Sequence, residues 1–358
     1  MMNRPRLVLI ALLLASFSLA AVSFALKPRK EEGVETLRLL TGPPSVDYLP
    51  QYIAREKNFF AEEGLNVQVK SAADEDALPA ALADGRAEII LTGLERAIYA
   101  RSEGRAQTVA FAALTAADGT YLLARRATGT FKWTDLKEKT VITGRPDSRE
   151  TVLLEGILRR HGIAPNRDVT LYTNIPARLR AGAFLSGSGD FILAGEPLAT
   201  QLAERQAGTV VAVLGREAGP LPAVVYVTTE ETARKRARAL QRFARAVYRA
   251  QLWLAGHDAG EAAALAAPYL TGVDRAQLVN IIERYRAMGL WAADPRVPRE
   301  GYRVYMNLLE QAREVPGPLD YRTMVDAGPA AAAVNEVRKR LERESRPWYA
   351  PLLKIVSW

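Results

Sequence analysis

The stretch QYIAREKNFFAEEGLNVQVK, residues 51–70, joins two kinds of periodicity with almost no connecting segment. Its first part has helical spacing, with Tyr52, Ile53 and Phe60 on one face, and Pro50 before it suits a first helical turn. Gly64 adopts positive φ without steric cost, so it predicts the end of the helix. The following NVQVK alternates apolar and polar side chains, as a half-buried strand does. The stretch therefore predicts a helix that turns sharply into a strand.

The same alternation extends along most of the chain. TLRLLTG before the joint reads as a strand, and helices and strands with short connections continue to about residue 113. The pattern restarts near residue 121, and after AVVYVTTE (223–230) only helical runs follow, at 233–256, 261–269, 275–288 and 299–312. Such alternation predicts an α/β fold in which helices flank mostly parallel sheets.

Two alternating units followed by a helical return predict a chain that builds one lobe, crosses to a second lobe and comes back. We expect the crossings at 121–125 and 224–228, lying side by side as a hinge. Lobe 1 then comprises residues 36–122 and 226–330, lobe 2 comprises 123–225, and 331–358 is a C-terminal extension. In that extension, 338–346 reads as a solvated helix and 348–358 is apolar enough to pack on a lobe, touch lipid or meet a partner.

Composition excludes several classes of protein. The 358 residues are 49% hydrophobic and 25% charged, as in a soluble globular protein. The net charge of +8 is spread along the chain without a basic stripe, so we expect no nucleic-acid partner. There is no cysteine, which excludes disulfides, thiolate metal sites and cysteine nucleophiles. The two histidines lack acids at metal-ligand spacing, so we expect neither a metal nor a cofactor.

The N-terminus predicts export. Arg4 and Arg6 precede an uncharged run from Leu7 to Leu26, and a small residue at Ala25 suits a cleavage site. The run is also about long enough to span a bilayer, so residues 1–26 are either a signal peptide or a membrane anchor. Residues 27–35 then form a polar tether. Either reading places the rest of the chain outside the cytoplasm, in the periplasm or at the outer face of the membrane.

Residues 45–69 resemble the opening signature of ABC-transporter substrate-binding proteins for nitrate, sulfonates, taurine, thiamine pyrimidines and riboflavin. Asn58 replaces the family's usual glycine, and the matching positions are Ala54, Glu56, Lys57, Phe60, Glu63, Gly64, Leu65 and Val67. Further segments match in order, with Glu88 for Asp in LADGRAEIILTG and Glu138 for Gly in FKWTDLKEKTVITG. GEPLAT and the helix from Ala246 complete a likeness that runs from about residue 36 to 328.

The resemblance implies a type II periplasmic-binding-protein fold with a cleft between two lobes and no catalysis. It also implies a monomer that closes on a small molecule and delivers it to a membrane permease with its ATPase. Two alternatives stay open: a cysteine-free enzyme on the same fold, and a membrane-tethered sensor.

Candidate ligand contacts lie in the loops after strands, because ligands of open α/β sheets bind beyond the carboxyl ends of the strands. Four such loops, two in each predicted lobe, end in turn-prone and polar residues, and a tyrosine at each predicted crossing completes the set. The candidates are Pro44, Asp47, Tyr48, Leu49, Thr92, Gly93, Leu94, Glu95, Tyr121, Asp147, Ser148, Arg149, Glu196 and Tyr226.

Several candidates also have purely structural interpretations. Asp147 or Ser148 suits the N-cap of the next helix, and Glu196 suits the start of another. Phe59–Phe60, Trp133 and Trp253 are expected in the core. Acids outnumber Arg149 among the candidate loops, which disfavours a purely anionic ligand. We therefore expect a nitrogen-bearing heterocycle or amine, such as a pyrimidine or a flavin precursor.

Overall fold

The computed structural model describes residues 33–127, 129–315 and 317–344. The predicted leader, most of the tether and the apolar segment 348–358 lie outside these residues. Within the described part of the chain, no helix is both long enough and apolar enough to cross a membrane.

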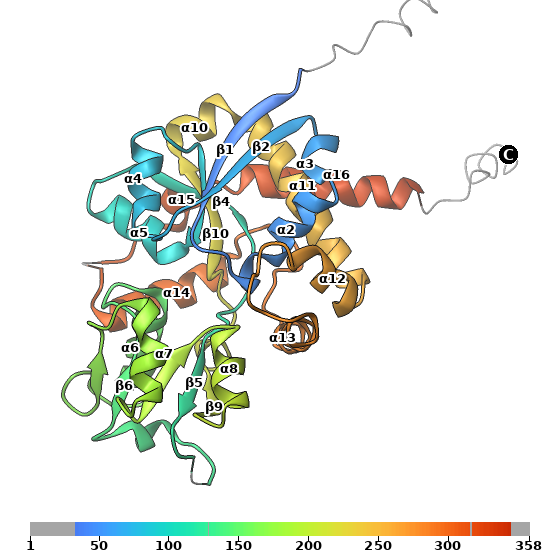
Figure 1. The fold of residues 1–358 in the computed structure, drawn as a ribbon. Coiled ribbons are helices and arrows are strands. Elements are labelled where there is room, and N and C mark those ends of the chain that lie inside the picture. Colours follow the sequence, from blue (N-terminus) through green and yellow to red (C-terminus); the bar gives the residue numbers. More distant parts are fainter. Residues whose placement is uncertain (1–32, 128, 316, 345–358) are drawn as a thin grey trace, which may run out of the picture. The chain divides into compact units, whose positions relative to one another are not determined.

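The chain forms two five-stranded sheets, each flanked by helices (Figure 1). The order in the first sheet is β2 (Leu65–Ser71), β1 (Glu35–Thr41), β3 (Ile89–Gly93), β10 (Val224–Thr229) and β4 (Thr108–Ala113). The order in the second is β7 (Thr170–Tyr172), β6 (Thr140–Ile142), β8 (Phe191–Ala194), β5 (Tyr121–Ala124) and β9 (Thr209–Val213). The predicted two-lobed α/β fold is confirmed.

One strand in each sheet runs against its neighbours. β10 is antiparallel to β3 and β4, with Tyr226 opposite Leu91, and β5 is antiparallel to β8 and β9. Both sheets are therefore mixed. The expected crossings, 121–125 and 224–228, lie instead within or directly beside these antiparallel strands, β5 (121–124) and β10 (224–229). The connections between the two sheets are residues 114–120, before β5, and 219–223, before β10. The expected crossing residues are paired in the sheets because each strand begins directly after its connection.

Short helices follow the strands of each lobe. In lobe 1 they are η1 (Val46–Tyr48), α2 (Leu49–Glu56), α3 (Phe59–Glu62), α4 (Ala77–Ala83) and α5 (Leu94–Ser102). In lobe 2 they are η2 (Trp133–Leu136), α6 (Arg149–Arg160), α7 (Ala177–Leu185), α8 (Leu198–Glu204) and α9 (Leu214–Ala218).

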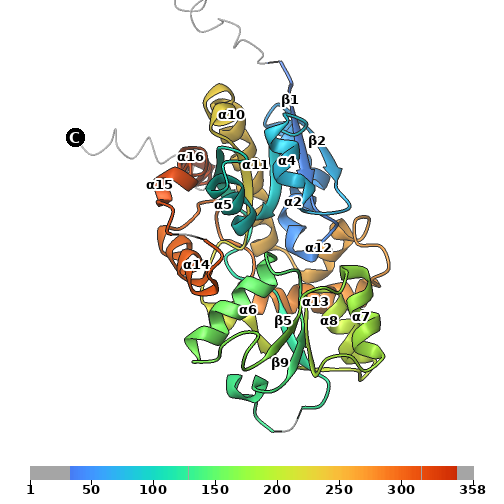
Figure 2. The same ribbon diagram turned by 90° about the vertical axis from the view of Figure 1, so that its left-hand side faces the viewer.

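The helical return is longer than the sequence predicts. Its helices are α10 (Glu230–Lys235), α11 (Ala237–Gly256), α12 (Ala259–Ala266), α13 (Arg275–Ala287), α14 (Arg299–Ala312), α15 (Tyr321–Met324) and α16 (Gly328–Glu344). Figures 1 and 2 show α13 and α14 at the level between the two sheets. α14 packs along α6 of lobe 2, where Gly156 lies against the backbone of Leu308. The return therefore contacts both lobes.

The opening stretch does not form one helix. α2 ends at Glu56, and Asn58 takes a left-handed conformation with φ of 58° before α3 begins. Asparagine is among the few residues besides glycine that adopt this region readily, so the break falls where the family has its glycine. Gly64 has φ of 69° and turns the chain into β2, as predicted.

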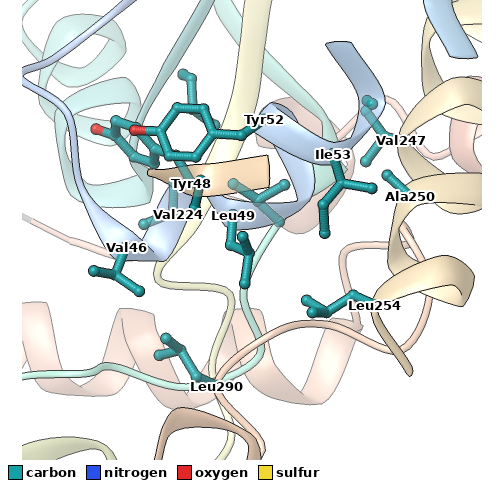
Figure 3. Packing of buried hydrophobic residues seen from close by; sticks show 14 of the residues in the cluster. Val46, Tyr48, Leu49, Tyr52, Ile53, Val224, Val247, Ala250, Leu254 and Leu290 are labelled. Atoms are coloured by element: carbon teal, nitrogen blue, oxygen red, sulfur yellow. The ribbon is translucent and has the colours of Figure 1, made fainter. Parts of the chain in front are cut away.

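The apolar face of α2 packs into the core of lobe 1. Figure 3 shows Ile53 beside Val247 and Ala250 of α11, and Leu49 on the same helix above Leu290. Leu49 and Ile53 are fully buried. Burying a side chain of this size stabilises the fold by roughly 1.5–3 kcal/mol. The packing fixes the start of α2, and with it the loop that carries Asp47 and Tyr48.

Candidate functional site

Loops from both lobes meet beside the first connection between the sheets. Asp47 lies in η1 after β1, and Arg149 begins α6 after β6. Asp118, in the connection 114–120, lies between them: Arg149 Nε is 2.9 Å from Asp118 Oδ2, and Arg149 Nη2 is 3.3 Å from Asp47 Oδ2. The loop of lobe 1, the loop of lobe 2 and the connecting segment are thus joined by one guanidinium.

This ion cluster is buried. The side chain of Asp118 is fully buried, and only 11% of that of Asp47 is exposed. Burial raises the pKa of Asp47 to about 6 and outweighs the attraction of Arg149. Burial alone would lower the pKa of Arg149, but Asp118 and Asp47 hold it well above its usual value. Two carboxylates face one guanidinium, so the trio carries an excess negative charge above pH 6.

A glycine lies at the end of β1, β3, β6 and β8 or just after it, and carboxylates cover three of these four strand-end glycines. Gly42 lies against Glu75, and a Cβ there would be 2.5 Å from Glu75 Cγ. A Cβ at Gly93 or Gly144 would be 2.2 Å from a carboxylate oxygen in the first turn of α5 or α6, that of Glu95 or Glu150. At Gly144 the Ser148 hydroxyl lies closer still. The fourth, Gly195 after β8, has open space where a Cβ would be.

Tyrosines and an arginine hold two of these carboxylates in place. Tyr48 donates a 3.2 Å hydrogen bond to Glu75, and Tyr305 of α14 donates a 2.7 Å bond to Glu95. Arg96 Nε is 3.3 Å from Glu75 and 3.8 Å from Glu95. Glu95 is buried, and burial raises its pKa. Glu95 is therefore fixed in the interior, whereas Glu75 is held by Tyr48 and Arg96 and keeps partial contact with solvent.

A second polar group surrounds Glu196. Its carboxylate is 2.6 Å from Arg284 of α13 and accepts hydrogen bonds from the backbone and hydroxyl of Thr200. The hydroxyl of Tyr285 accepts from the Glu196 backbone amide at 3.2 Å and donates to the Gly119 carbonyl at 3.3 Å. α13 thereby fixes the β8 loop of lobe 2 next to the connection that carries Asp118.

Aromatic rings link the two polar groups. Tyr285 lies 5.9 Å from Trp291 in an edge-to-face arrangement and 6.3 Å from Tyr121 in a stacked one. Trp291 Nε1 donates a 3.1 Å hydrogen bond to the backbone carbonyl of Asp47. Aromatic rings therefore lie beside the acids of the strand-end loops. Each of these acids is paired with an arginine: Arg96, Arg149, Arg180 or Arg284.

Comparison with known proteins agrees with this architecture. The sequence profile of a family described as NMT1/THI5 like matches residues 45–260. The chain belongs to the NMT1/THI5-like family. The resemblance predicted from the sequence is confirmed.

Two proteins with similar folds and one relative in sequence illustrate the likeness. "Putative binding protein YtlA" of Bacillus subtilis (strain 168) is 29% identical over 309 residues, which cover 86% of this chain and 92% of the relative. The alkanesulfonate-binding protein SsuA of Xanthomonas axonopodis pv. citri, bound to MOPS, has a TM-score of 0.67 at 18% identity, covering 82% of this chain and 99% of its own. A DszB mutant in complex with biphenyl-2-sulfinic acid has a TM-score of 0.62 at 16% identity, covering 84% of this chain and 99% of its own.

In this NMT1/THI5-like chain, some predicted site residues lie together and others do not. Asp47 and Arg149 belong to the ion cluster, and Tyr48 and Glu95 interact with Arg149 electrostatically without a direct bond. Glu196 lies in the second polar group, with Tyr121 close to its Arg284. Asp147 pairs with Arg145 at 3.2 Å at the edge, and Ser148 is the N-cap position of α6, although its side chain makes no capping bond.

The remaining candidates lie in the core or at the surface. Tyr226 is fully buried in lobe 1, and its hydroxyl donates a 2.5 Å hydrogen bond to Gln51. Leu49, Thr92 and Leu94 are fully buried, Gly93 lies under Glu95, and Pro44 is exposed.

Sequence reasoning missed the residues that come from distant segments. They are Glu75, Arg96, Asp118, Tyr285, Trp291 and Tyr305. Only Asp118 carried a local signal, an Asp-Gly pair typical of a turn. The others lie within helices or next to them, and nothing in their neighbouring sequence marks them.

Other features lie away from the strand-end loops. A hollow of about 960 Å³ adjoins Lys139, Thr140 and Asp190, at the opposite ends of β6 and β8. His161 pairs with Glu217 at 2.7 Å, and His257 contacts the Trp253 carbonyl. Among the described residues, no group of three or more histidine or acidic side chains is arranged to hold a metal.

Proposed function

We propose that this chain is the extracytoplasmic solute-binding component of an ABC importer. It acts as a monomer, captures one small molecule between its lobes and delivers it to a permease with its ATPase. Family membership, the two-lobed fold and the binding-protein descriptions of its relatives support this proposal. The apolar run from Leu7 to Leu26 supports export, whether it is cleaved or retained.

We further propose that the ligand is a nitrogen-bearing heterocycle or amine. The observation that carries this choice is the cover of carboxylates over Gly42, Gly93 and Gly144. Helix N-termini with free backbone N–H groups are natural anion sites. Here Glu95 and Glu150 already stand in the first turns of α5 and α6, so the negative charge that those positions favour is supplied by the protein.

The excess charge of the ion cluster supports the same ligand class. A ligand that brings N–H donors to Asp47 would neutralise the second carboxylate that Arg149 leaves unmatched. We expect the ring of the ligand to lie near Gly195, where no atom occupies the position of a Cβ, and against the partly buried ring of Trp291. Because Asp47 and Arg149 come from different lobes and already pair directly, a ligand that contacts this cluster favours the closed arrangement.

We propose no catalytic role. DszB shares the fold, but the sulfur chemistry expected from the resemblance requires a cysteine nucleophile, and this chain contains no cysteine. The buried polar groups of the site are paired with one another and do not form a nucleophile–base pair.

Thermal-shift and calorimetric screening of the mature protein tests the ligand class. We expect aminopyrimidines or riboflavin to raise the melting temperature, and taurine, alkanesulfonates and nitrate to leave it unchanged. Affinity is expected to rise as the pH increases through about 6, where Asp47 loses its proton. Asp47→Asn should weaken binding about tenfold, because one charge-assisted hydrogen bond to the ligand is lost. Asp84→Asn, at an exposed site away from the ion cluster, is the matched control.

Stabilisation by the anions alone would refute the proposed ligand class. Co-purification of the chain with its neighbouring permease, and ligand-dependent stimulation of the ATPase in proteoliposomes, would support the importer role. An ATPase that does not respond to the liganded protein would refute that role.

A further inference from the structure

A separate cavity lies at the edge of the interlobe contact. It encloses about 270 Å³ between α4 and α5 of lobe 1 and the loop before α6 of lobe 2. Its polar lining consists of Asp76, Arg96, Tyr99, Arg105, Arg145 and Asp147. Of these, only Asp147 stood out in the sequence. A cavity of this size holds a group no larger than a single ring.

Tyr99 is an unpartnered polar group in this lining. Only 6% of the residue is exposed, and its hydroxyl is buried with no hydrogen-bond partner among the described residues. Burial, followed by Glu95, raises the pKa of Tyr99, so the hydroxyl keeps its proton at physiological pH and remains a donor. A buried donor without an acceptor is unfavourable, and an incoming acceptor atom would relieve it.

The arginines of the lining are potential donors for the same kind of group. Three arginines and two aspartates line the cavity, and Glu75, Glu95 and Glu103 outside it also pair with Arg96 or Arg105. Arg96 and Arg145 share Asp76 across the lobe boundary, and Arg145 also pairs with Asp147. Arg105 pairs with Glu103, and about half of each of these two side chains is exposed. Arg105 is therefore able to turn toward a second anion at little cost.

We infer that this edge cavity binds the carboxylate or carbonyl end of the solute, with the Tyr99 hydroxyl and the Arg105 guanidinium as donors. The inference rests on the proposed solute-binding role and extends it. The ligand then has two ends, a nitrogen-bearing part held by the acids around Asp47 and an acceptor held at Tyr99. Carboxylate acceptors meet one end and hydrogen-bond donors meet the other, which selects for amphoteric molecules.

Three probes with the same benzene ring distinguish binding at the edge cavity from binding at the central ion cluster. Benzylamine carries only the nitrogen, benzoate only the carboxylate, and 4-(aminomethyl)benzoate carries both. Calorimetry is run with the wild type, with Tyr99→Phe and with Tyr302→Phe. Tyr302 is the matched control because its hydroxyl already donates a 2.8 Å hydrogen bond to the Leu319 carbonyl.

We expect 4-(aminomethyl)benzoate to bind about tenfold more tightly than benzylamine, as one charge-assisted hydrogen bond provides. Tyr99→Phe should abolish that advantage, leave benzylamine binding unchanged and leave the free protein at least as stable as the wild type. Tyr302→Phe should lower the melting temperature by about 2 °C without changing the preference. A structural role for Tyr99 would instead lower the stability of the free protein.

Equal affinity for the two amines, or an advantage that survives in Tyr99→Phe, would overturn the edge site while the proposed function stands. Binding of benzoate alone, lost in Tyr99→Phe, would support the edge site and refute the proposed ligand class. If neither benzoate nor 4-(aminomethyl)benzoate bound at millimolar concentration, the edge site would also be overturned. Binding of benzylamine tests the central ion cluster independently of the edge site.

Discussion

At the scale of single residues, two departures from the family signature have a visible structural consequence. Asn58 and Glu138 replace glycines of the resembling proteins, and both adopt positive φ, 58° and 61°. The left-handed conformation costs a residue with a Cβ roughly 1–2 kcal/mol, less for asparagine. Both turns therefore keep the left-handed conformation, although the Cβ atoms of Asn58 and Glu138 crowd the backbone there.

Restoring glycine at these positions should stabilise the protein. We expect Glu138→Gly to raise the free energy of unfolding by about 1 kcal/mol and Asn58→Gly by less, since asparagine tolerates the conformation. Urea denaturation measures both. Glu103→Gly is the control, because Glu103 has φ of −87° and should gain nothing. If Glu103→Gly raised the free energy of unfolding and Glu138→Gly did not, the left-handed conformation would not be the source of the cost at Glu138.

Asp47 predicts a pH dependence with a definite sign. Its pKa is about 6 in the folded protein, above the ordinary value of 3.8, so the folded state binds the proton more tightly. Stability contributed by this group is therefore greatest below pH 4 and is lost as the pH rises to about 6. Relative to Asp47→Asn, the wild type should lose at most about 3 kcal/mol over that window, at about 1.4 kcal/mol per pKa unit. Urea denaturation of both proteins at pH 4 and pH 7 measures this, and parallel pH profiles would contradict it.

At the scale of elements, α14 connects the return helices to lobe 2 through a close backbone contact. A Cβ at Gly156 of α6 would lie 2.8 Å from Leu308 Cδ2 and 3.0 Å from its carbonyl oxygen. The same helix supplies Tyr305 to Glu95 of lobe 1. α14 therefore spans the two lobes, and its spacing to α6 depends on the missing side chain.

Gly156→Ala should destabilise the protein by about 1–3 kcal/mol, because the added methyl group overpacks the α6–α14 contact. Gly182→Ala is a matched control in the middle of α7, where the position of a Cβ is unobstructed, and it should stabilise by about 0.5–1 kcal/mol. Thermal unfolding of the two variants compares them directly. Equal effects of the two substitutions would mean that the contact is looser than described.

At the scale of the whole molecule, two arginines of one loop connect lobe 2 to lobe 1 in different ways. The Arg149 side chain is 21% exposed and faces two buried carboxylates, whereas that of Arg145 is 44% exposed and pairs with Asp76. A buried charge that loses its partner is costly, but a solvated pair contributes little.

Arg149→Met should therefore cost about 3–5 kcal/mol, since Asp47 and Asp118 lose their shared cation, and Arg145→Met at most about 1 kcal/mol. Urea denaturation at low and at high salt separates the two effects, because only the exposed pair is strongly screened. If Arg145→Met proved the more damaging of the two, the assignment of the main interlobe contact would be wrong.

The sequence alone determined the fold class, the family and the loops at the carboxyl ends of the strands. These features follow from local periodicity, from glycines such as Gly64 and from motifs a few residues long, which nearby residues encode by themselves. Asp47, Arg149 and Glu196 were found because they lie in such loops.

Only the tertiary structure decided which side chains face those loops. Tyr285, Trp291 and Tyr305 come from a return that begins about a hundred residues after the second lobe's first strands, and their neighbouring sequence is ordinary helix and loop. Long-range packing also placed Glu75 over Gly42 and Tyr226 inside the core. Such contacts depend on how the lobes and the return close on one another, a long-range outcome that residue spacing along the chain does not specify.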